Sequence, residues 1–107
     1  MSGTLKRLKT LVARGEVRIS DHGYDELAED GILAKDLVET FSDAELLEDY
    51  PDFAKGPCVL VLQRNRQGQA IHAVWGIPRG EESPAVVVTA YRPDPKKWTD
   101  DFRSRKK

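Results

Sequence analysis

The stretch GPCVLVLQR, residues 56–64, decides the fold of this chain. Its centre is an uninterrupted apolar run from Cys58 to Leu62. Successive side chains of a strand point to opposite faces of a sheet, so a run of this kind is apolar on both faces. We therefore predict that residues 56–64 form a central strand that is covered, at least partly, on both sides.

The segments around this run predict an antiparallel sheet. AELLEDY, residues 44–50, changes the apolar period from 3.6 to 2 and stops at Pro51. NRQG, residues 65–68, is a turn signal of hairpin length, and QAIHAVWGI, residues 69–77, follows it as the next strand. AVVVTAYR, residues 85–92, is predicted to be the last strand. Strands joined by such short loops pair antiparallel.

The first part of the chain has helical periodicity instead. Apolar residues at spacings of three and four predict a helix over residues 4–14. EVRIS, residues 16–20, alternates and is predicted to be a short strand or an extended linker. Two more helices are predicted over residues 21–30, which Gly31 ends, and over residues 34–41.

The C-terminal region has a signature of its own. Asp94-Pro95 resembles a helix cap followed by proline at the first helical position, which predicts a short C-terminal helix. Trp98 and Phe102, four residues apart, are predicted to pack it back on the sheet, ahead of a basic tail, residues 103–107. The order of elements predicts an α+β domain, with N-terminal helices packed on an antiparallel sheet of about four strands.

Composition limits the class of protein. With 107 residues, the chain is predicted to be a single domain, residues 1–107. The single cysteine, Cys58, cannot form an internal disulfide and is predicted to lie in the core. No apolar run approaches the ~20 residues of a membrane helix, and the first ten residues lack the apolar segment of a signal peptide. We therefore expect a cytoplasmic protein.

The net charge of −1 conceals a strong partition along the chain. Residues 1–20 contain five basic and one acidic residue, whereas residues 21–55 contain two basic and twelve acidic residues. Residues 56–107 contain ten basic and five acidic residues. An acidic middle thus lies between basic ends, either as an ordinary solvated surface or as a surface that binds a partner.

His22 is the first candidate for chemistry, because it lies at the start of a predicted helix among acidic residues. Asp25 and Glu26 follow at spacings of three and four, so either can lie beside the imidazole on one helix face. A carboxylate that holds the ring in one tautomer would suit a general base near neutral pH. The alternative is a histidine that only brackets the helix start.

His72 is the second candidate, in the middle of the strand over residues 69–77. Its face of that strand carries mostly small side chains, which leaves room for a ligand. Depending on the register with the last strand, His72 meets either Thr89 and Tyr91 or Arg92, and the sequence leaves both registers open. The alternative is a core histidine that is hydrogen-bonded to a neighbour.

Two histidines, a tyrosine and an arginine are the residue types that metal-free RNA cleavage uses. A base removes the 2′-hydroxyl proton, an acid protonates the leaving oxygen, and a cation stabilises the phosphorane. A metal site formed by His22, His72 and either Asp25 or Glu26 is the rival use of these histidines. The chain has no tight metal-ligand motif, so we predict no metal and no cofactor.

Four short motifs occur in an order that resembles a bacterial domain family of unknown function, DUF4258. They are Ser20-Asp21-His22, Gly31-Ile32, His72-Ala73-Val74 and Thr89-Ala90-Tyr91-Arg92-Pro93. The resemblance covers about residues 16–98. That family looks like a branch of the RelE-like superfamily of small ribonuclease toxins, whose fold is helices followed by an antiparallel sheet.

The resemblance implies a metal-independent endoribonuclease of the toxin–antitoxin type, with RNA as substrate and an antitoxin-like protein as partner. The catalytic positions that it carries over are His22, His72, Tyr91 and Arg92, with Thr89 in support.

This chain departs from the family pattern at two positions. The family often has arginine where this chain has Glu26 and Asp30, so each difference replaces a phosphate-binding cation with an anion. Phosphate contacts supply most non-specific affinity for nucleic acids. RNA would then bind through a basic groove elsewhere, for which Arg64, Arg66 and Arg79 are the candidates besides Arg92.

The alternative function is a catalytically silent module that keeps the fold. Its acidic helical segment would dock a basic protein partner. The two functions differ in what they require of the histidines, which must share one pocket in an enzyme and lie apart in a binding module.

Overall fold

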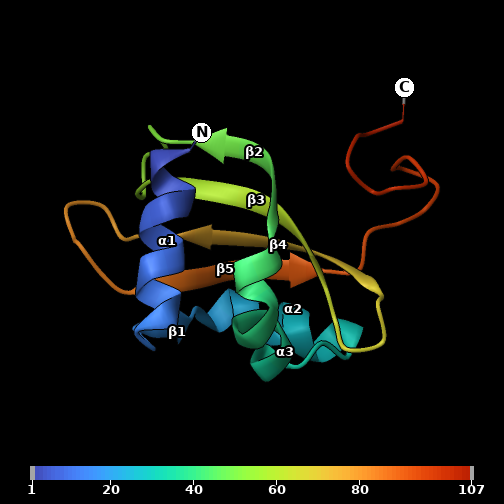
Figure 1. The fold of residues 1–107 in the computed structure, drawn as a ribbon, viewed down its shortest axis with the longest axis horizontal. Coiled ribbons are helices and arrows are strands. Elements are labelled where there is room, and N and C mark those ends of the chain that lie inside the picture. Colours follow the sequence, from blue (N-terminus) through green and yellow to red (C-terminus); the bar gives the residue numbers. More distant parts are fainter. Residues whose placement is uncertain (1, 107) are drawn as a thin grey trace.

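The computed structural model describes residues 2–106, which form helices and one five-stranded sheet (Figure 1). The elements in chain order are α1 (Gly3–Ala13), β1 (Val17–Ile19), α2 (Asp21–Asp30), α3 (Ala34–Thr40), the 3-10 helix η1 (Phe41–Asp43), β2 (Glu45–Tyr50), β3 (Cys58–Arg64), β4 (Ala70–Gly76) and β5 (Ala85–Tyr91). The predicted α+β class is confirmed. None of the helices in residues 2–106 is long and apolar enough to cross a membrane.

The sheet is mixed, with the strand order β1-β5-β4-β3-β2. Strands β2 to β5 form the predicted antiparallel meander, and β1 adds a fifth strand that runs parallel to β5. The prediction of about four antiparallel strands is corrected here, because β1 pairs with the outer edge of β5. Backbone hydrogen bonds from Ala85 to Glu16 and from Ser20 to Val87 join the two strands. An edge strand with unpaired backbone groups favours such an addition.

The predicted C-terminal helix is wrong. Asp94 accepts hydrogen bonds from the backbone N–H of Lys96 and of Trp98, which closes a single turn. The chain then reverses, with Phe102 in the left-handed region at φ 60°, and Trp98 forms an antiparallel bridge with Arg105. The helix stops because the return places Trp98 and both arginines of this segment against the sheet, as described below.

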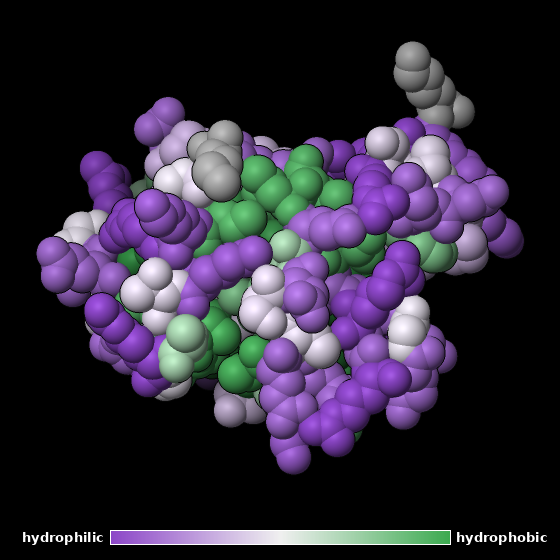
Figure 2. All heavy atoms as spheres, viewed as in Figure 1, coloured by the Kyte–Doolittle hydropathy of each residue, from purple (hydrophilic) through white to green (hydrophobic). Residues whose placement is uncertain are grey.

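Helices α1 and α3 pack on one face of the sheet (Figure 1). Hydrophilic side chains dominate this side of the molecule, with apolar atoms visible between them (Figure 2). Beneath them, Trp75 is fully buried, and its ring packs against the tilted ring of Phe41 at a centroid distance of 4.4 Å. The rest of this core comes from α1, the two later helices and alternate positions of β3, β4 and β5.

Helix α2 packs along β5 at the edge of the sheet. An added Cβ at Gly23 would lie 2.8 Å from the carbonyl oxygen of Val87, so this close approach requires glycine. Ser20 links the two elements, because its Oγ accepts a hydrogen bond from the Gly23 N–H and donates one to the Val88 carbonyl. Gly31 ends α2 at φ 64°, as predicted.

A buried amide organises the core beneath the helices. Gln63 is 2% exposed, and its Oε1 accepts a hydrogen bond of 2.8 Å from the indole N–H of Trp75. Its Nε2 donates to the carbonyl of Leu37 at 2.8 Å and to the hydroxyl of Thr40 at 3.1 Å. Gln63 therefore joins β3, β4 and the end of α3 through one side chain.

Replacement of Gln63 tests this role. The substitution Gln63→Leu leaves the Trp75 indole N–H and the Leu37 carbonyl without partners in the core. We expect the free energy of unfolding to fall by about 1–3 kcal/mol, the cost of leaving buried polar groups unpaired. Urea unfolding measures it, and the exposed turn residue Gln67, as Gln67→Leu, is the matched control. Equal stability of the two variants would contradict this account.

Candidate functional site

The face of the sheet opposite α1 and α3, called the second face below, carries the candidate residues. Strand register arranges its side chains in three rows of cross-strand neighbours. The first row is Arg18, Val86, Gly76, Cys58 and Tyr50; the middle row is Thr89, Val74, Leu60 and Glu48; the last row is Tyr91, His72, Leu62 and Glu45. His72 thus lies on the same face as the first row. It is four residues from Gly76 along β4, which corresponds to about 13 Å between the two positions.

A bulge in β5 decides which residues meet His72. Trp75 pairs with Val87 but Val74 pairs with Thr89, so Val88 is an extra residue. The bulge directs Val87 into the core and Thr89 and Tyr91 to the second face, although strict alternation would place all three on one face. The register that the sequence left open is therefore the one in which His72 meets Tyr91.

His72 is fully buried and hydrogen-bonded at both nitrogens. Its Nε2 donates to the backbone carbonyl of Phe102 at 2.8 Å, and the Tyr91 hydroxyl donates to its Nδ1 at 3.4 Å. Trp98 covers the ring edge-on, with centroids 4.2 Å apart. This is the geometry of the alternative given for His72 above, a core histidine that is hydrogen-bonded to its neighbours.

Burial lowers the pKa of His72 below 6.5, although its hydrogen bond to Phe102 acts in the opposite direction. Burial also raises the pKa of Tyr91 above 10.0. The groups that face His72 are Tyr91 from β5, Glu48 from β2, and Arg105 with the Phe102 carbonyl from the C-terminal segment. His72 is therefore a neutral imidazole at neutral pH, and no ligand reaches it past Trp98.

His22 has the opposite environment. It lies in the first turn of α2 with its side chain 67% exposed, and its Nε2 is 3.4 Å from Oε1 of Glu26. Glu26, rather than Asp25, is thus the acid that reaches the imidazole. His22 lines a groove on the second face, whereas His72 does not, so the structure does not bring the two rings together.

The groove occupies the first row of the second face and has a volume of about 630 Å³. Its floor is apolar, with Cys58, Gly76 and Val86 between the flanking side chains. Arg18, Ser20 and His22 flank it on one side, and Tyr50, Phe53 and Lys55 on the other. Among residues 2–106, no carboxylate lies within ion-pair distance of Arg18 or Lys55. The groove therefore combines an apolar floor with cations and two exposed aromatic rings.

The four predicted arginines do not converge. Arg92 donates from Nε to the carbonyl of Asp30 at 2.9 Å and from its guanidinium to Gln69 at 3.1 Å. Arg66 pairs with Glu39 and Asp36 beside α3. Arg79 follows β4, at the opposite end of that strand from Arg64. Arg18 and Lys55, which line the groove, were not among the predicted cations. They become recognisable as candidates only when the sheet places them beside its second face.

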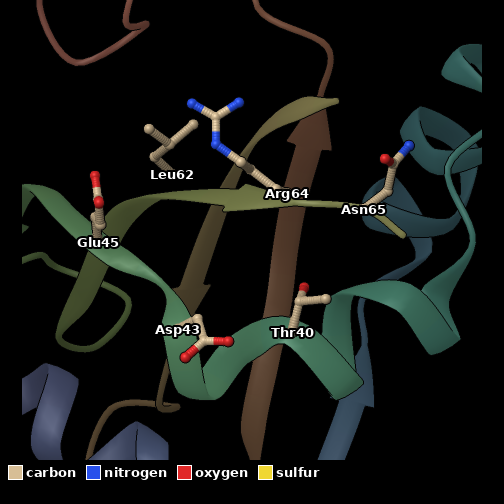
Figure 3. Close-up of a pocket in the computed structure, with 6 residues that line it drawn as sticks. All are labelled: Thr40, Asp43, Glu45, Leu62, Arg64 and Asn65. Carbon is tan, nitrogen blue, oxygen red and sulfur yellow. The ribbon is translucent and has the colours of Figure 1, made fainter. Parts of the chain in front are cut away.

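Arg64 belongs to a smaller hollow of about 320 Å³ at the edge of the sheet. Figure 3 shows its lining, with Arg64 and Leu62 from β3, Glu45 from β2, Thr40 from α3 and Asp43 from η1. The Arg64 guanidinium donates to the Gly68 carbonyl at 3.1 Å. This hollow lies beside the last row, not beside the groove.

Acidic residues of β2 pair with the predicted basic tail. Arg103 donates to both carboxylate oxygens of Glu45 at 2.7 and 2.9 Å, and Arg105 pairs in the same way with Glu48. These hydrogen bonds lower the pKa of Glu45 and Glu48 below 4.5. Part of the acidic middle of the sequence is thus neutralised by the basic end of the same chain.

The structure also bears on Cys58 and on a possible metal site. Cys58 is buried, as predicted, and burial raises the pKa of its thiol above 9.0. Within residues 2–106, no three His, Cys, Asp or Glu side chains are arranged to hold a metal ion.

Together these features define an α+β domain with a mixed sheet whose second face is half covered and half open. The chain belongs to the family described as Domain of unknown function (DUF4258), which matches residues 19–92. No curated protein and no solved structure matches the chain significantly. The matched segment runs from the end of β1 to Arg92, so it contains both histidines and leaves α1 and the segment after β5 outside.

The buried histidine generates a prediction about pH. The pKa of His72 is lower in the folded state than the ordinary 6.5, so protonation favours the unfolded state. We expect its contribution to stability to be complete above pH 6.5 and to be lost as the pH falls below it. The carboxylates of Glu45 and Glu48 stay ionised through most of this range, because their pKa values lie below 4.5.

Urea unfolding between about pH 7.5 and pH 5 measures this dependence. His72→Gln keeps a donor for the Phe102 carbonyl and removes the titrating group, so its unfolding should lose most of the dependence between these values. His22→Gln, which removes an exposed histidine, should retain it. A wild type that is equally stable at both ends of the range would contradict the assignment.

Proposed function

We propose that this domain is a metal-independent endoribonuclease of RelE-like ancestry that binds single-stranded RNA along the second face of its sheet. His22 and His72 lie apart, which is the arrangement expected of the binding module, so the enzyme rests on His22 alone as the base. The observation that supports it most is the groove, which is lined by the exposed imidazole of His22 together with cations and aromatic rings. Single-stranded nucleic acids bind to surfaces of this kind, where bases stack on aromatic side chains and cations contact the backbone.

The groove offers a separate partner for each part of a nucleotide. Tyr50 and Phe53 are 42% and 53% exposed, so their rings are available to bases. Arg18 and Lys55 lack carboxylate partners in the described residues and would contact phosphates. The acids at positions 26 and 30 do not line the groove: Glu26 contacts His22, and the Asp30 carboxylate accepts a hydrogen bond from the backbone N–H of Arg92.

His22 would supply the base for the cleavage step. It takes the proton of a 2′-hydroxyl, and the resulting oxygen attacks the adjacent phosphorus. The bond from phosphorus to the 5′-oxygen breaks, that oxygen takes a proton from a water molecule, and the His22 imidazolium returns its proton to solvent. The products are a 2′,3′-cyclic phosphate and a 5′-hydroxyl. The Glu26 carboxylate orients the imidazole, and Arg18 stabilises the phosphorane charge.

Cleavage of a labelled single-stranded RNA in the presence of EDTA tests the chemistry. His22→Gln should lower the rate by about 100-fold or more, the typical contribution of a general acid or base. The control is Glu29→Gln, an exposed acid on the same helix that lies outside the groove. Absence of cleavage by the wild type and by the variants described in the next section would rule out the ribonuclease.

RNA affinity tests the groove independently of cleavage. Phe53→Ala should weaken binding by about 1–3 kcal/mol, the usual contribution of one stacked base. Tyr24→Ala is the matched control, because Tyr24 is 60% exposed but does not line the groove. Fluorescence anisotropy with a labelled oligonucleotide measures both variants, and equal affinities would place the RNA elsewhere.

A second candidate function is the docking of a basic protein partner, such as an antitoxin-like protein, on α2. Asp21, Asp25 and Glu29 are exposed on this helix and have no cationic partner within the described residues, whereas Glu45 and Glu48 of β2 are paired. Co-purification with the product of the adjacent gene, abolished by Asp25→Asn and Glu29→Gln together, would support this function.

A further inference from the structure

The segment after β5, residues 94–106, lies over the last row of the second face and is called the cover below. Trp98 is 7% exposed and packs edge-on against His72. Arg105 lies over the Trp98 ring, 4.8 Å from its centroid. The cover therefore seals the half of the second face that the groove leaves free.

The backbone of the cover is hydrogen-bonded almost entirely to itself. Thr99 and Ser104 are joined by a hydrogen bond of 2.8 Å, and Lys106 donates to Lys97 at 2.9 Å. In the described residues, the hydrogen bond from His72 to the Phe102 carbonyl is the main-chain contact that the cover makes with the sheet. The cover can thus leave as one unit without breaking a strand pairing.

The remaining attachments are the buried ring of Trp98 and the ion pairs of Arg103 and Arg105. Arg103 pairs with Glu45, and both side chains are 48% exposed. Arg105 pairs with Glu48. Exposed ion pairs contribute little to stability and weaken with salt.

We propose that the cover is an autoinhibitory strap that must lift before a ligand reaches His72 and Tyr91. This inference rests on the proposed function and concerns the regulation of its site. Because the three rows are continuous, a lifted cover extends the groove from Arg18 and His22 to His72 and Tyr91.

The chemical accessibility of His72 tests the cover without any assay of cleavage. Diethyl pyrocarbonate modifies exposed imidazoles, and mass spectrometry compares His72 with His22 in the same sample. Arg103→Glu removes an attachment that does not touch His72. We expect this variant to raise the modification rate of His72 by about tenfold, because it shifts a local opening equilibrium.

Two matched variants separate opening from general damage. Lys96→Glu makes the same charge reversal at an exposed position of the cover and should leave the rate unchanged. The double variant Glu45→Arg with Arg103→Glu restores the pair with exchanged charges and should restore wild-type protection. An unchanged modification rate of His72 in Arg103→Glu would overturn the displaceable cover. So would amide hydrogen exchange in which the cover opens only when β3 and β4 also open.

Cleavage then decides whether the cover regulates activity. Arg103→Glu should cleave RNA faster than both Lys96→Glu and the charge-exchanged double variant. Increased His72 accessibility with an unchanged, measurable cleavage rate would overturn autoinhibition. Increased accessibility with no cleavage in any variant would instead refute the ribonuclease, while the displaceable cover stands on the accessibility data alone.

Discussion

The structure depends on one constraint, which is that β3 and β4 bury side chains on both of their faces. Every residue of β3 from Cys58 to Gln63 is buried. A strand of this kind is stable only when both faces are shielded from water. The helices α1 and α3 cover one face, whereas the second face is divided between an open groove and the C-terminal cover. The candidate site exists because this second layer is incomplete.

The partition of charge along the chain has a structural explanation. Glu45 and Glu48 of the acidic middle bind Arg103 and Arg105 of the basic end. A tail that the sequence presents as a solvated basic segment is therefore part of the packed structure. Asp21, Asp25 and Glu29 of α2 have no cationic partner within the described residues, so this helix is suited to a basic partner, whereas the cations of the groove are suited to an anionic ligand.

The two histidines have different roles in this arrangement. His22 is exposed, contacts Glu26 and lines the groove, so its imidazole is accessible to a ligand in the groove. His72 is neutral and buried, and it binds the cover through the Phe102 carbonyl. A histidine that anchors a removable segment links two properties of the domain, since the contact that stabilises the closed state also hides a group with acid–base chemistry.

The sequence by itself determined the three N-terminal helices and the antiparallel strands β2 to β5. Apolar periodicity placed the helices and the strands β2 to β5 within a few residues, because each pattern reflects the local geometry of one element. Gly31 likewise marked the end of α2 through a local backbone requirement. The two histidines were recognisable as candidate residues, but the sequence did not show that they lie apart in the fold.

Only the tertiary structure decided what these residues contact. The bulge at Val88 placed Tyr91 beside His72, and the pairing of β1 with β5 added a strand that a three-residue segment could not specify alone. The return of the chain after Asp94 replaced a locally favoured helix with burial of Trp98 against His72. Register, edge pairing and long-range ion pairs join residues far apart in the chain, so local propensity contains no information about them.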